Sequence, residues 1–425
     1  MPQSRRRLSA LLSTALVLAC GSSTADSGAK RSGAAGENRT RPEATPEPLP
    51  KLKAAAIAPA VGSRTPNLVT TSSGLLLTWL EAGPGEEMVL RLARGTTEGW
   101  TEPLVITRGP LLDNWADFPA AAALPDGTLV ATWRRRFEGD HGYGIEWSRS
   151  TDEGRSWSTP QILHEHTDGP EYGFVSTATT ADNRLAVFWL DGRTSTADGG
   201  QMQLRTASIG RQGPPTDRQL VDDRVCDCCQ TSAAATGRGP VVAYRDRSAH
   251  EIRDIFVAGP GLRQGEVVAN DGWMIEGCPV NGPSLAAQGE RLAIAWYTAA
   301  NDEPRVWAAF GTVSGAFETP RAIDLGQPEG RVSLVMLDAY DAVVTWLERR
   351  DGENGAPGEA VILARRITRR GLAGPAYAVA KTKAARASGF PRSARLGDQL
   401  VWAWTEIGPG TSQVRVAQAP VSALG

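Results

Sequence analysis

The chain has 425 residues, 41% of them apolar and 22% charged, with a formal net charge of −2. This balance is typical of a soluble globular protein, and no basic stripe stands out, so nucleic acid is not an expected partner. The 46 glycines and 28 prolines favour many short strands joined by many turns.

The N-terminus has the pattern of an export signal. Residues 5–7 are three arginines, and the apolar stretch 8–19 is too short to span a bilayer as a stable anchor. The stretch runs into Val17-Leu18-Ala19-Cys20, which resembles the bacterial lipobox, and the resemblance implies that Cys20 receives the lipid. An ordinary cleaved signal peptide with an incidental cysteine is the alternative.

Three regions follow from this interpretation. Residues 1–19 are the predicted signal peptide, 20–50 the lipidated cysteine with a flexible linker, and 51–425 the folded domain. The linker is rich in Ser, Gly, Ala, Thr, Pro and charged residues, so it buries too little apolar surface to offset its ordering entropy. The protein is expected to be exported and held on the bacterial membrane by its lipid, on the periplasmic or the outer surface.

A repeated pattern determines the predicted architecture. An apolar strand that ends in an aromatic residue follows a turn of Gly, Asp or Asn, and this pattern recurs seven times at nearly regular intervals. Each unit adds a third and a fourth short strand, which is the content of one propeller blade. The repeated aromatics, expected to pack between blades, are Trp79, Trp133, Trp189, Tyr244, Trp296, Trp346 and Trp404.

The predicted fold class is all-β, a single β-propeller of four-stranded antiparallel blades. The seventh unit stops at Val421 without a fourth strand, and the segment 52–58 offers one. Pairing of this N-terminal strand with the last blade would close the ring and remove two exposed sheet edges. Seven blades are therefore favoured, with six as the alternative.

One turn in the second unit carries a marker of fold. Ser150, Asp152, Gly154 and Trp157 match the pattern Ser/Thr-x-Asp-x-Gly-x-x-Trp, which resembles the Asp box (BNR repeat) of bacterial sialidase-like propellers. The Asp is expected to accept backbone N–H bonds in a tight hairpin, while the Gly takes a positive φ and the Trp docks on the blade. The resemblance implies a structural role without catalysis.

A second stretch resembles the same superfamily. Arg64-Thr65-Pro66-Asn67, followed by Gly74-Leu75-Leu76 and Glu81, is similar to the opening of sialidases. In that family the Arg is one of three that hold the carboxylate of the sugar, so the resemblance implies a glycan or glycoconjugate as partner. Sialidases have six blades, which is the basis of the six-bladed alternative.

The phase of the repeat places side chains at a common level. Loops that lead into the first strand of a blade and loops that leave the second share one face, around a central funnel. Arg64 and Arg331 precede their aromatics by the same number of positions and so fall at the same height. A third arginine follows the second strand of blade four, where Arg247 is the candidate and Arg245 the alternative. These arginines are the predicted substrate-binding residues, because guanidinium groups hold carboxylates in a bidentate manner.

Acid–base groups are predicted on the same face. A glycosidase needs two groups beside the glycosidic bond, and sialidases use a Tyr as nucleophile. Asp117 is the candidate proton donor, and Glu276 is the candidate carboxylate that would activate the Tyr. No Tyr falls at the position that the family requires, which argues against cleavage of sialic acid.

Four cysteines follow Cys20. Cys226 and Cys278 precede their aromatics by equal spacings and so occupy equivalent places on adjacent blades, which favours one or two disulfides between the two loops. A metal or redox site built from Cys226, Cys228, Cys229 and Cys278 stays open as an alternative, as do free thiols. The spacing does not choose among the three complete pairings.

The leading hypothesis is a cell-envelope, sialidase-like glycoside hydrolase that acts on an anionic sugar. The alternative is a non-catalytic propeller that binds a glycan or a protein, and a further alternative is a metal or redox role of the cysteines. A monomer without a cofactor is expected. The arginines favour the enzyme, whereas the missing Tyr favours the binding protein.

Overall fold

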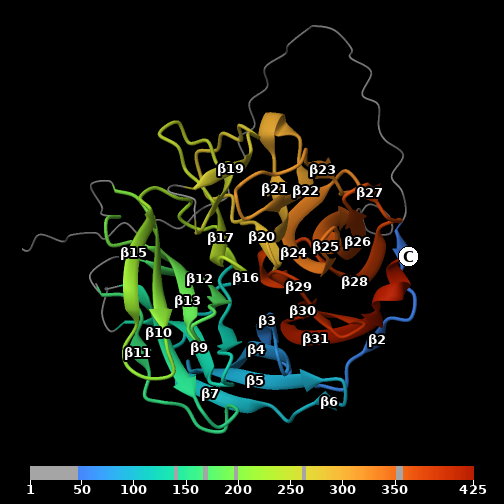
Figure 1. Cartoon of the computed structure of the whole chain (residues 1–425). Coiled ribbons are helices and arrows are strands. Elements are labelled where there is room, and N and C mark those ends of the chain that lie inside the picture. Colours follow the sequence, from blue (N-terminus) through green and yellow to red (C-terminus); the bar gives the residue numbers. More distant parts are fainter. Residues whose placement is uncertain (1–45, 138–141, 166–170, 196–199, 261–264, 351–357) are drawn as a thin grey trace, which may run out of the picture. The chain divides into compact units, whose positions relative to one another are not determined.

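The computed structural model describes residues 46–137, 142–165, 171–195, 200–260, 265–350 and 358–425. They form seven mainly antiparallel sheets arranged around a common axis (Figure 1). The predictions of an all-β fold and of seven blades are confirmed, and the six-bladed alternative is wrong. The predicted signal peptide and Cys20 lie outside the described residues. In the described part of the chain, no helix combines the length and the apolar character needed to cross a bilayer.

Blades one to four follow the chain, each from an inner strand to an outer one. Blade one has β3 (Arg64–Thr71), β4 (Gly74–Ala82) and β5 (Met88–Thr96), with β6 (Gly99–Trp100) and β7 (Leu104–Gly109) outside. Blade two has β8 (Ala120–Ala123), β9 (Leu129–Arg136), β10 (Tyr143–Ser150) and β11 (Gln161–Ile162). Blade three has β12 (Tyr172–Thr179), β13 (Leu185–Asp191), β14 (Gln203–Ile209) and β15 (Thr216–Asp222). Blade four has β16 (Ser232–Thr236), β17 (Gly239–Arg245), β18 (Ile255–Ala258) and β19 (Glu266–Ala269).

Blades five to seven complete the ring. Blade five has β20 (Ser284–Gln288), β21 (Arg291–Thr298), β22 (Arg305–Thr312) and β23 (Arg321–Ala322). Blade six has β24 (Pro328–Asp338), β25 (Asp341–Arg350), β26 (Glu359–Thr368), β27 (Gly371–Leu372) and β28 (Tyr377–Lys383). Blade seven has β29 (Arg392–Leu396), β30 (Gln399–Gly408) and β31 (Thr411–Pro420). Three short 3₁₀ helices, η1 (Ala300–Asp302), η2 (Arg386–Ser388) and η3 (Val421–Leu424), interrupt or follow these strands.

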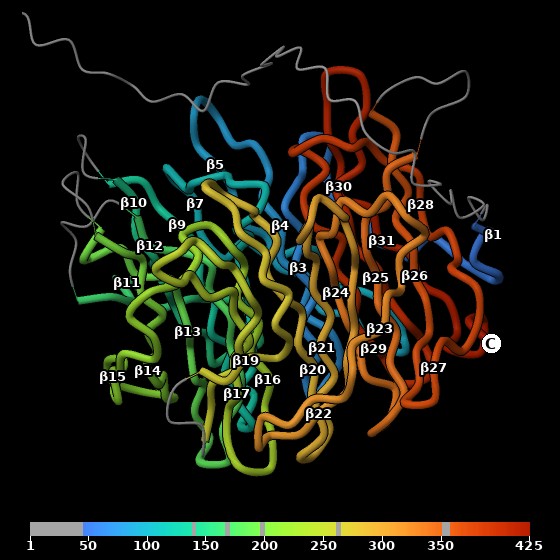
Figure 2. The backbone as a smooth tube through the Cα atoms, turned by 90° about the horizontal axis from the view of Figure 1, so that it is seen from above, coloured from blue at the N-terminus to red at the C-terminus, as the bar shows by residue number. Residues whose placement is uncertain are grey.

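Two N-terminal strands join the last two blades. β2 (Lys53–Ala54) pairs antiparallel with β31 as the fourth strand of blade seven. β1 (Glu47–Pro48) runs parallel to β28 at the outer edge of blade six (Figure 2), and Leu49 beside it is buried. Residues 47 to 49, which the sequence assigned to the linker, therefore belong to the outer edge of blade six, with Leu49 as the buried residue.

The repeated tryptophans form the core between blades, as predicted. Trp79, Trp189, Trp296 and Trp346 are at most 1% exposed. A tryptophan buried this deeply needs an acceptor for its indole N–H. In blades one, three and six this acceptor is the carboxylate two residues later, since residues i and i+2 of a strand lie on one face. The donor and acceptor pairs are Trp79 with Glu81, Trp189 with Asp191, and Trp346 with Glu348, at 2.8, 2.8 and 2.6 Å.

Serine side chains link the inner strands of neighbouring blades. The Ser232 hydroxyl accepts the backbone N–H of Leu285 in the next blade at 2.9 Å, and Ser284 accepts that of Leu334 at 2.9 Å. Inner strands of different blades belong to separate sheets. The serine hydroxyl therefore accepts the backbone N–H in place of a carbonyl of a paired strand. This use explains the many small polar residues near the axis.

The turn between β10 and β11 has a dense hydrogen-bond network. The Asp152 carboxylate accepts the backbone N–H of Ser156 at 2.9 Å, and the Ser150 hydroxyl accepts that of Gly154 at 2.9 Å. Gly154 has a φ of +89°, and the Trp157 indole donates to its carbonyl at 3.1 Å. These contacts stay within one turn, so this segment has the local geometry that its four motif residues predict.

Candidate functional site

A channel of about 690 Å³ follows the propeller axis and is lined by the innermost strand of every blade. These strands, among them β3, β12, β16, β20, β24 and β29, lie around the centre in Figure 1. Most side chains that face the channel are Ala, Ser or Thr. Small residues leave free space where seven strands converge, and a cavity of this size is typical of a ligand site.

Four aromatic rings, termed here the aromatic plug, meet where the inner strands begin. They are Trp115, Phe118, Phe174 and Phe390. The ring of Phe390 in blade seven lies 6.1 Å from Trp115 and 6.0 Å from Phe118, which belong to the loop before blade two. Blade one stands between those two blades in the ring, so these contacts reach across it. The plug therefore covers the axis on the face where the sequence placed the funnel.

The channel is closed at the plug and exposed at its other end. Phe118 and Asn67 line the plug end and are 5% and 4% exposed. Thr70, Ala235 and Gly397 line the opposite end and are exposed. A ligand would therefore approach from the face where the first and second strands of each blade are joined.

Three polar side chains at the closed end leave hydrogen-bonding atoms unused. Asn67 Oδ1, Gln230 Oε1 and Arg392 Nε are buried, and none has a hydrogen-bond partner within the described part of the chain. All three residues line the channel. Buried polar atoms nearly always find a partner, so three of them at one end indicate a place for a polar ligand or water.

Arg392 is a half-buried charge without a counter-ion among the described residues. Its guanidinium lies 4.7 Å from the centre of the Phe118 ring. Burial lowers the pKa of Arg392 to about 10, so the side chain keeps its charge at neutral pH. Among the described residues, no carboxylate forms an ion pair with it. A buried charge is costly unless it is paired, and an anion would supply the pair.

The three arginines predicted from the repeat are not brought together in the channel. Arg64 forms an ion pair with Asp113, on the loop before blade two. Arg331 is 5% exposed, and its Nη1 donates to the carbonyls of Ala385 and Gly389 at 2.8 and 3.0 Å. Neither arginine lines the channel. Equal height in the repeat thus did not produce a shared site.

Arg247 also has partners of its own. It forms ion pairs with Asp227 at 2.8 Å and with Glu251 at 3.0 Å, beside the cysteines of blade four. Its charge is therefore balanced by two carboxylates. The three predicted arginines therefore do not form one site, because each interacts with different partners. They are Arg64, Arg331 and Arg247.

Asp117 lies between blades two and three instead of facing the channel. It is 5% exposed, contacts Arg134 Nη1 at 2.9 Å and accepts the backbone N–H of Phe174 at 2.8 Å. Burial raises the pKa of the Asp117 carboxyl, and the charge of Arg134 opposes this effect. Glu276 is exposed, and no described hydrogen bond or ion pair joins it to Asp117. The two predicted acid–base residues do not form a pair.

A tyrosine and a carboxylate that the sequence analysis did not select stand beside Asp117. Tyr143 is hydrogen-bonded to Glu171, and the guanidinium of Arg134 lies 3.9 Å from the centre of its ring. Burial raises the pKa of the Tyr143 hydroxyl, with Arg134 opposing this and the Glu171 charge adding to it. A raised pKa disfavours a phenolate nucleophile. The group is best described as a buried ionic network that joins two blades.

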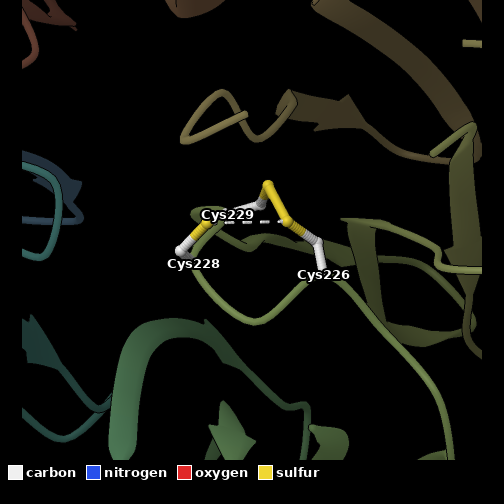
Figure 3. A group of neighbouring side chains, drawn as sticks. All are labelled: Cys226, Cys228 and Cys229. Atoms are coloured by element: carbon white, nitrogen blue, oxygen red, sulfur yellow. Dashed lines mark hydrogen bonds between the residues drawn. A yellow bond between two sulfur atoms is a disulfide. The ribbon is translucent and has the colours of Figure 1, made fainter. Parts of the chain in front are cut away.

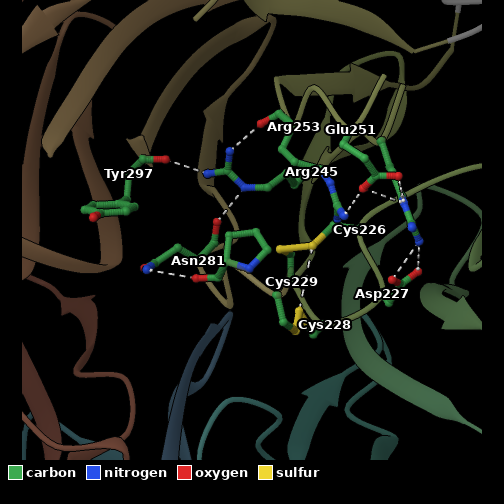
Figure 4. The surroundings of a disulfide bond; sticks show 12 residues. Cys226, Asp227, Cys228, Cys229, Arg245, Glu251, Arg253, Asn281 and Tyr297 are labelled. Atoms are coloured by element: carbon green, nitrogen blue, oxygen red, sulfur yellow. Dashed lines mark hydrogen bonds and ion pairs between the residues drawn. A yellow bond between two sulfur atoms is a disulfide. The ribbon is translucent and has the colours of Figure 1, made fainter. Parts of the chain in front are cut away.

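Four cysteines form two disulfides, Cys226–Cys229 (Figures 3 and 4) and Cys228–Cys278, with Cα separations of 5.6 and 6.1 Å. The expected link between the loops before blades four and five is present. It uses Cys228, although the repeat placed Cys226 and Cys278 at equivalent positions. Cys226 instead closes a short loop with Cys229, since the backbone turns within this segment.

No protein-family model matches the chain, and no curated protein matches it. Solved structures with similarity include a polysaccharide lyase, 10% identical with a TM-score of 0.49, covering 85% of this chain and 91% of that one. An α-L-arabinofuranosidase of Fusarium graminearum is 15% identical with a TM-score of 0.48, covering 85% and 94%. An intramolecular trans-sialidase from Ruminococcus gnavus is 11% identical with a TM-score of 0.47, covering 72% and 94%. The likeness concerns the overall fold and says nothing about the substrate of this chain.

A signal for Arg392 was present in the sequence. Several inner strands begin with a proline followed by a residue that faces the channel, at nearly the same spacing before the marker aromatic. The residues after these prolines are Asn67, Ala120, Ser284 and Arg392. A comparison of the repeats at the position after the proline, instead of at the position of Arg64, would have selected Arg392, the arginine among these four residues.

Proposed function

We propose that the protein binds an acidic saccharide at the closed end of its channel. The observation that carries the proposal is the half-buried charge of Arg392, which has no ion-pair partner among the described residues, in a channel of about 690 Å³. A guanidinium binds a carboxylate through two parallel hydrogen bonds, which offset the loss of water on burial.

The neighbouring groups suit the remainder of a sugar. Asn67 Oδ1 and Gln230 Oε1 are acceptors without a partner within the described residues, and sugar hydroxyls are donors. Phe118 offers an apolar ring at the same end of the channel. One cation, two acceptors and one apolar face match a ring that carries a carboxylate and several hydroxyls.

Binding is favoured over hydrolysis by the chemistry of the channel wall. The described residues that line it include no Asp, Glu or Tyr. A glycosidase needs an acid and a nucleophile or base beside the scissile bond. The described residues of the channel wall supply neither group. We therefore propose that the channel binds the saccharide, and the glycosidase hypothesis has no catalytic pair in the channel.

Isothermal titration calorimetry with the full chain tests the proposal. N-acetylneuraminic acid and glucuronic acid are titrated beside glucose, with Arg392→Gln as the test variant and Arg64→Gln as the matched control. Because a charged hydrogen bond contributes about 1.5–3 kcal/mol, Arg392→Gln should weaken binding of the acids by about 10- to 100-fold. Arg64→Gln should bind as the unmodified chain does.

Two outcomes would reject the proposal. Equal affinity for glucose and for the acids would show that the carboxylate is not recognised. Unchanged binding by Arg392→Gln would place the site elsewhere. A parallel assay measures release of the fluorophore from a fluorogenic sialoside. Release by the unmodified chain would support the glycosidase hypothesis, and loss of this activity in Asp117→Asn would identify Asp117 as the proton donor.

The location of the protein is part of the same proposal. The segment that ends in Cys20 supports export and attachment to a membrane by lipid. Metabolic labelling with a fatty acid should mark the unmodified protein, and Cys20→Ser should abolish the label. Equal labelling of both would show that another residue carries the lipid or that the label is not specific.

A further inference from the structure

Three sulfur atoms lie unusually close together in the loop before blade four. The Sγ atoms of Cys226, Cys228 and Cys229 are all within 4.8 Å of one another (Figure 3). Cys226 Sγ lies 4.0 Å from Cys228 Sγ, although each belongs to a different disulfide. The two disulfides are therefore neighbours in space and share one tetrapeptide.

Access to the two disulfides differs. Cys278 is exposed and Cys228 is half-buried, whereas Cys226 and Cys229 are 1% and 2% exposed. A thiol from solvent can therefore reach the Cys228–Cys278 bond, while the Cys226–Cys229 bond is shielded.

The surroundings of the inner disulfide hold arginines together with the carboxylates of Asp227 and Glu251. Arg245 and Arg253 lie around it (Figure 4), and Arg247 forms ion pairs with Asp227 and Glu251. Arg253 is 2% exposed, and its Nε and Nη1 have no hydrogen-bond partner among the described residues. Positive charge nearby stabilises a thiolate, which is the reactive form of cysteine and the better leaving group.

A structural role explains the two disulfides unequally. Cys228–Cys278 closes a loop with a sequence separation of 50, so it restricts the unfolded chain considerably. Cys226–Cys229 has a separation of only 3, and a loop this short restricts it little. The buried inner disulfide therefore calls for a reason other than stability. A Cys-x-x-Cys spacing is typical of pairs that exchange disulfides.

We propose that the four cysteines form a thiol–disulfide exchange relay that takes electrons from an external dithiol. A thiolate of the dithiol attacks Cys278 Sγ, the Cys228–Cys278 bond breaks, and Cys228 leaves as a thiolate. The second thiol of the dithiol then displaces Cys278, which takes up a proton, and the dithiol departs as a disulfide. The dithiol is oxidised by two electrons, and the outer disulfide is reduced by two.

The second stage moves the reduction inward. The Cys228 thiolate attacks Cys226 Sγ, which lies 4.0 Å away in the structure, and forms a Cys226–Cys228 bond. The Cys226–Cys229 bond breaks, and Cys229 leaves as a thiolate that takes up a proton. No electrons are gained or lost in this stage, so one disulfide remains. The relay is independent of the saccharide site, because it does not involve Arg392.

Two variants test the inner stage without any reductant. In Cys278→Ser the Cys228 thiol is free and can attack Cys226, whereas in Cys228→Ser the attacking thiol is absent. The full chains are quenched in acid, unfolded, alkylated with N-ethylmaleimide and mapped by peptide mass spectrometry. Because exchange needs a thiolate beside the disulfide, labelling of Cys229 should be at least about tenfold higher in Cys278→Ser than in Cys228→Ser.

The unmodified chain supplies a test that does not depend on the folding of a variant. One equivalent of dithiothreitol is added before the same quench and mapping. The relay predicts label on Cys229 as well as on Cys228 and Cys278. Label confined to Cys228 and Cys278, or to Cys228 alone in Cys278→Ser, would overturn the proposal. Four free thiols in the untreated chain would overturn it as well.

Discussion

Two arginines beside the aromatic plug, the buried Arg331 and the half-buried Arg392, differ in what they contact. Arg331 lies 4.8 Å from the ring of Trp115, and Arg392 lies 4.7 Å from that of Phe118. Burial lowers the pKa of each to about 10. Arg331 donates to two backbone carbonyls, whereas Arg392 has no hydrogen bond or ion pair among the described residues. Arg392 is therefore the more exposed of the two, and its unused hydrogen-bonding capacity distinguishes the candidate site.

Stability measurements should separate the two arginines most clearly. Arg331→Met should lower the free energy of unfolding by about 3 kcal/mol, because two buried carbonyls lose a charged donor. Arg392→Met should change it by less than about 1 kcal/mol or raise it, since a half-buried charge without a partner among the described residues is removed. Urea denaturation of both variants gives the values. Similar losses in both would mean that Arg392 is also held by protein contacts.

The pH dependence of binding examines the charge of Arg392 itself. Its pKa in the folded chain is about 10, so raising the pH through that value removes the proton and with it the attraction for a carboxylate. Affinity for glucuronic acid should be constant from pH 6 to 8 and fall by about tenfold or more above pH 10. Titrations at several pH values, with circular dichroism to confirm folding, measure this. Constant affinity at high pH would remove Arg392 from the site.

Asn67 allows the same comparison with a neutral group. Asn67→Leu removes an acceptor that has no partner within the described residues, so the free energy of unfolding should change by less than about 1 kcal/mol. Affinity for the acidic sugar should fall by about tenfold, since one hydrogen bond to a hydroxyl is lost. Denaturation and calorimetry on one preparation test both. A large loss of stability with unchanged affinity would contradict the assignment.

The smallest effect is expected for a group whose hydrogen bonds are all made locally. Hydrogen bonds from the side chain and backbone of Ser156 lower the pKa of Asp152 to about 2. A lowered folded pKa gives stability above the unfolded value, near 3.8, which is lost as the pH falls towards 2. Asp152→Asn should therefore be less stable than the unmodified chain at pH 7 and equally stable near pH 2. A pH-independent difference would contradict this origin.

The candidate site was predictable in part. Asn67 lies in the Arg64-Thr65-Pro66-Asn67 stretch, and the position after the proline recurs before Arg392. What the sequence could not provide was the partner of each arginine. Asp113 holds Arg64 from another loop, and such pairs depend on loop conformations that follow no repeat. The number of residues between each arginine and its aromatic residue predicted the height of the arginine along the axis. It gave no information on the direction in which the side chain points.

The sequence by itself determined the seven blades, the buried tryptophans and the geometry of the Asp152 turn. Each depends on contacts within a blade or within a single turn, so the blade-length repeat of the sequence encodes them directly. Only the tertiary structure decided which end of the channel is closed and which cysteines pair. Phe118 meets Phe390 across blade one, and Cys228 joins Cys278 over a separation of 50. Contacts of this kind form when the ring closes, because closure brings together segments that have no local relation in the chain.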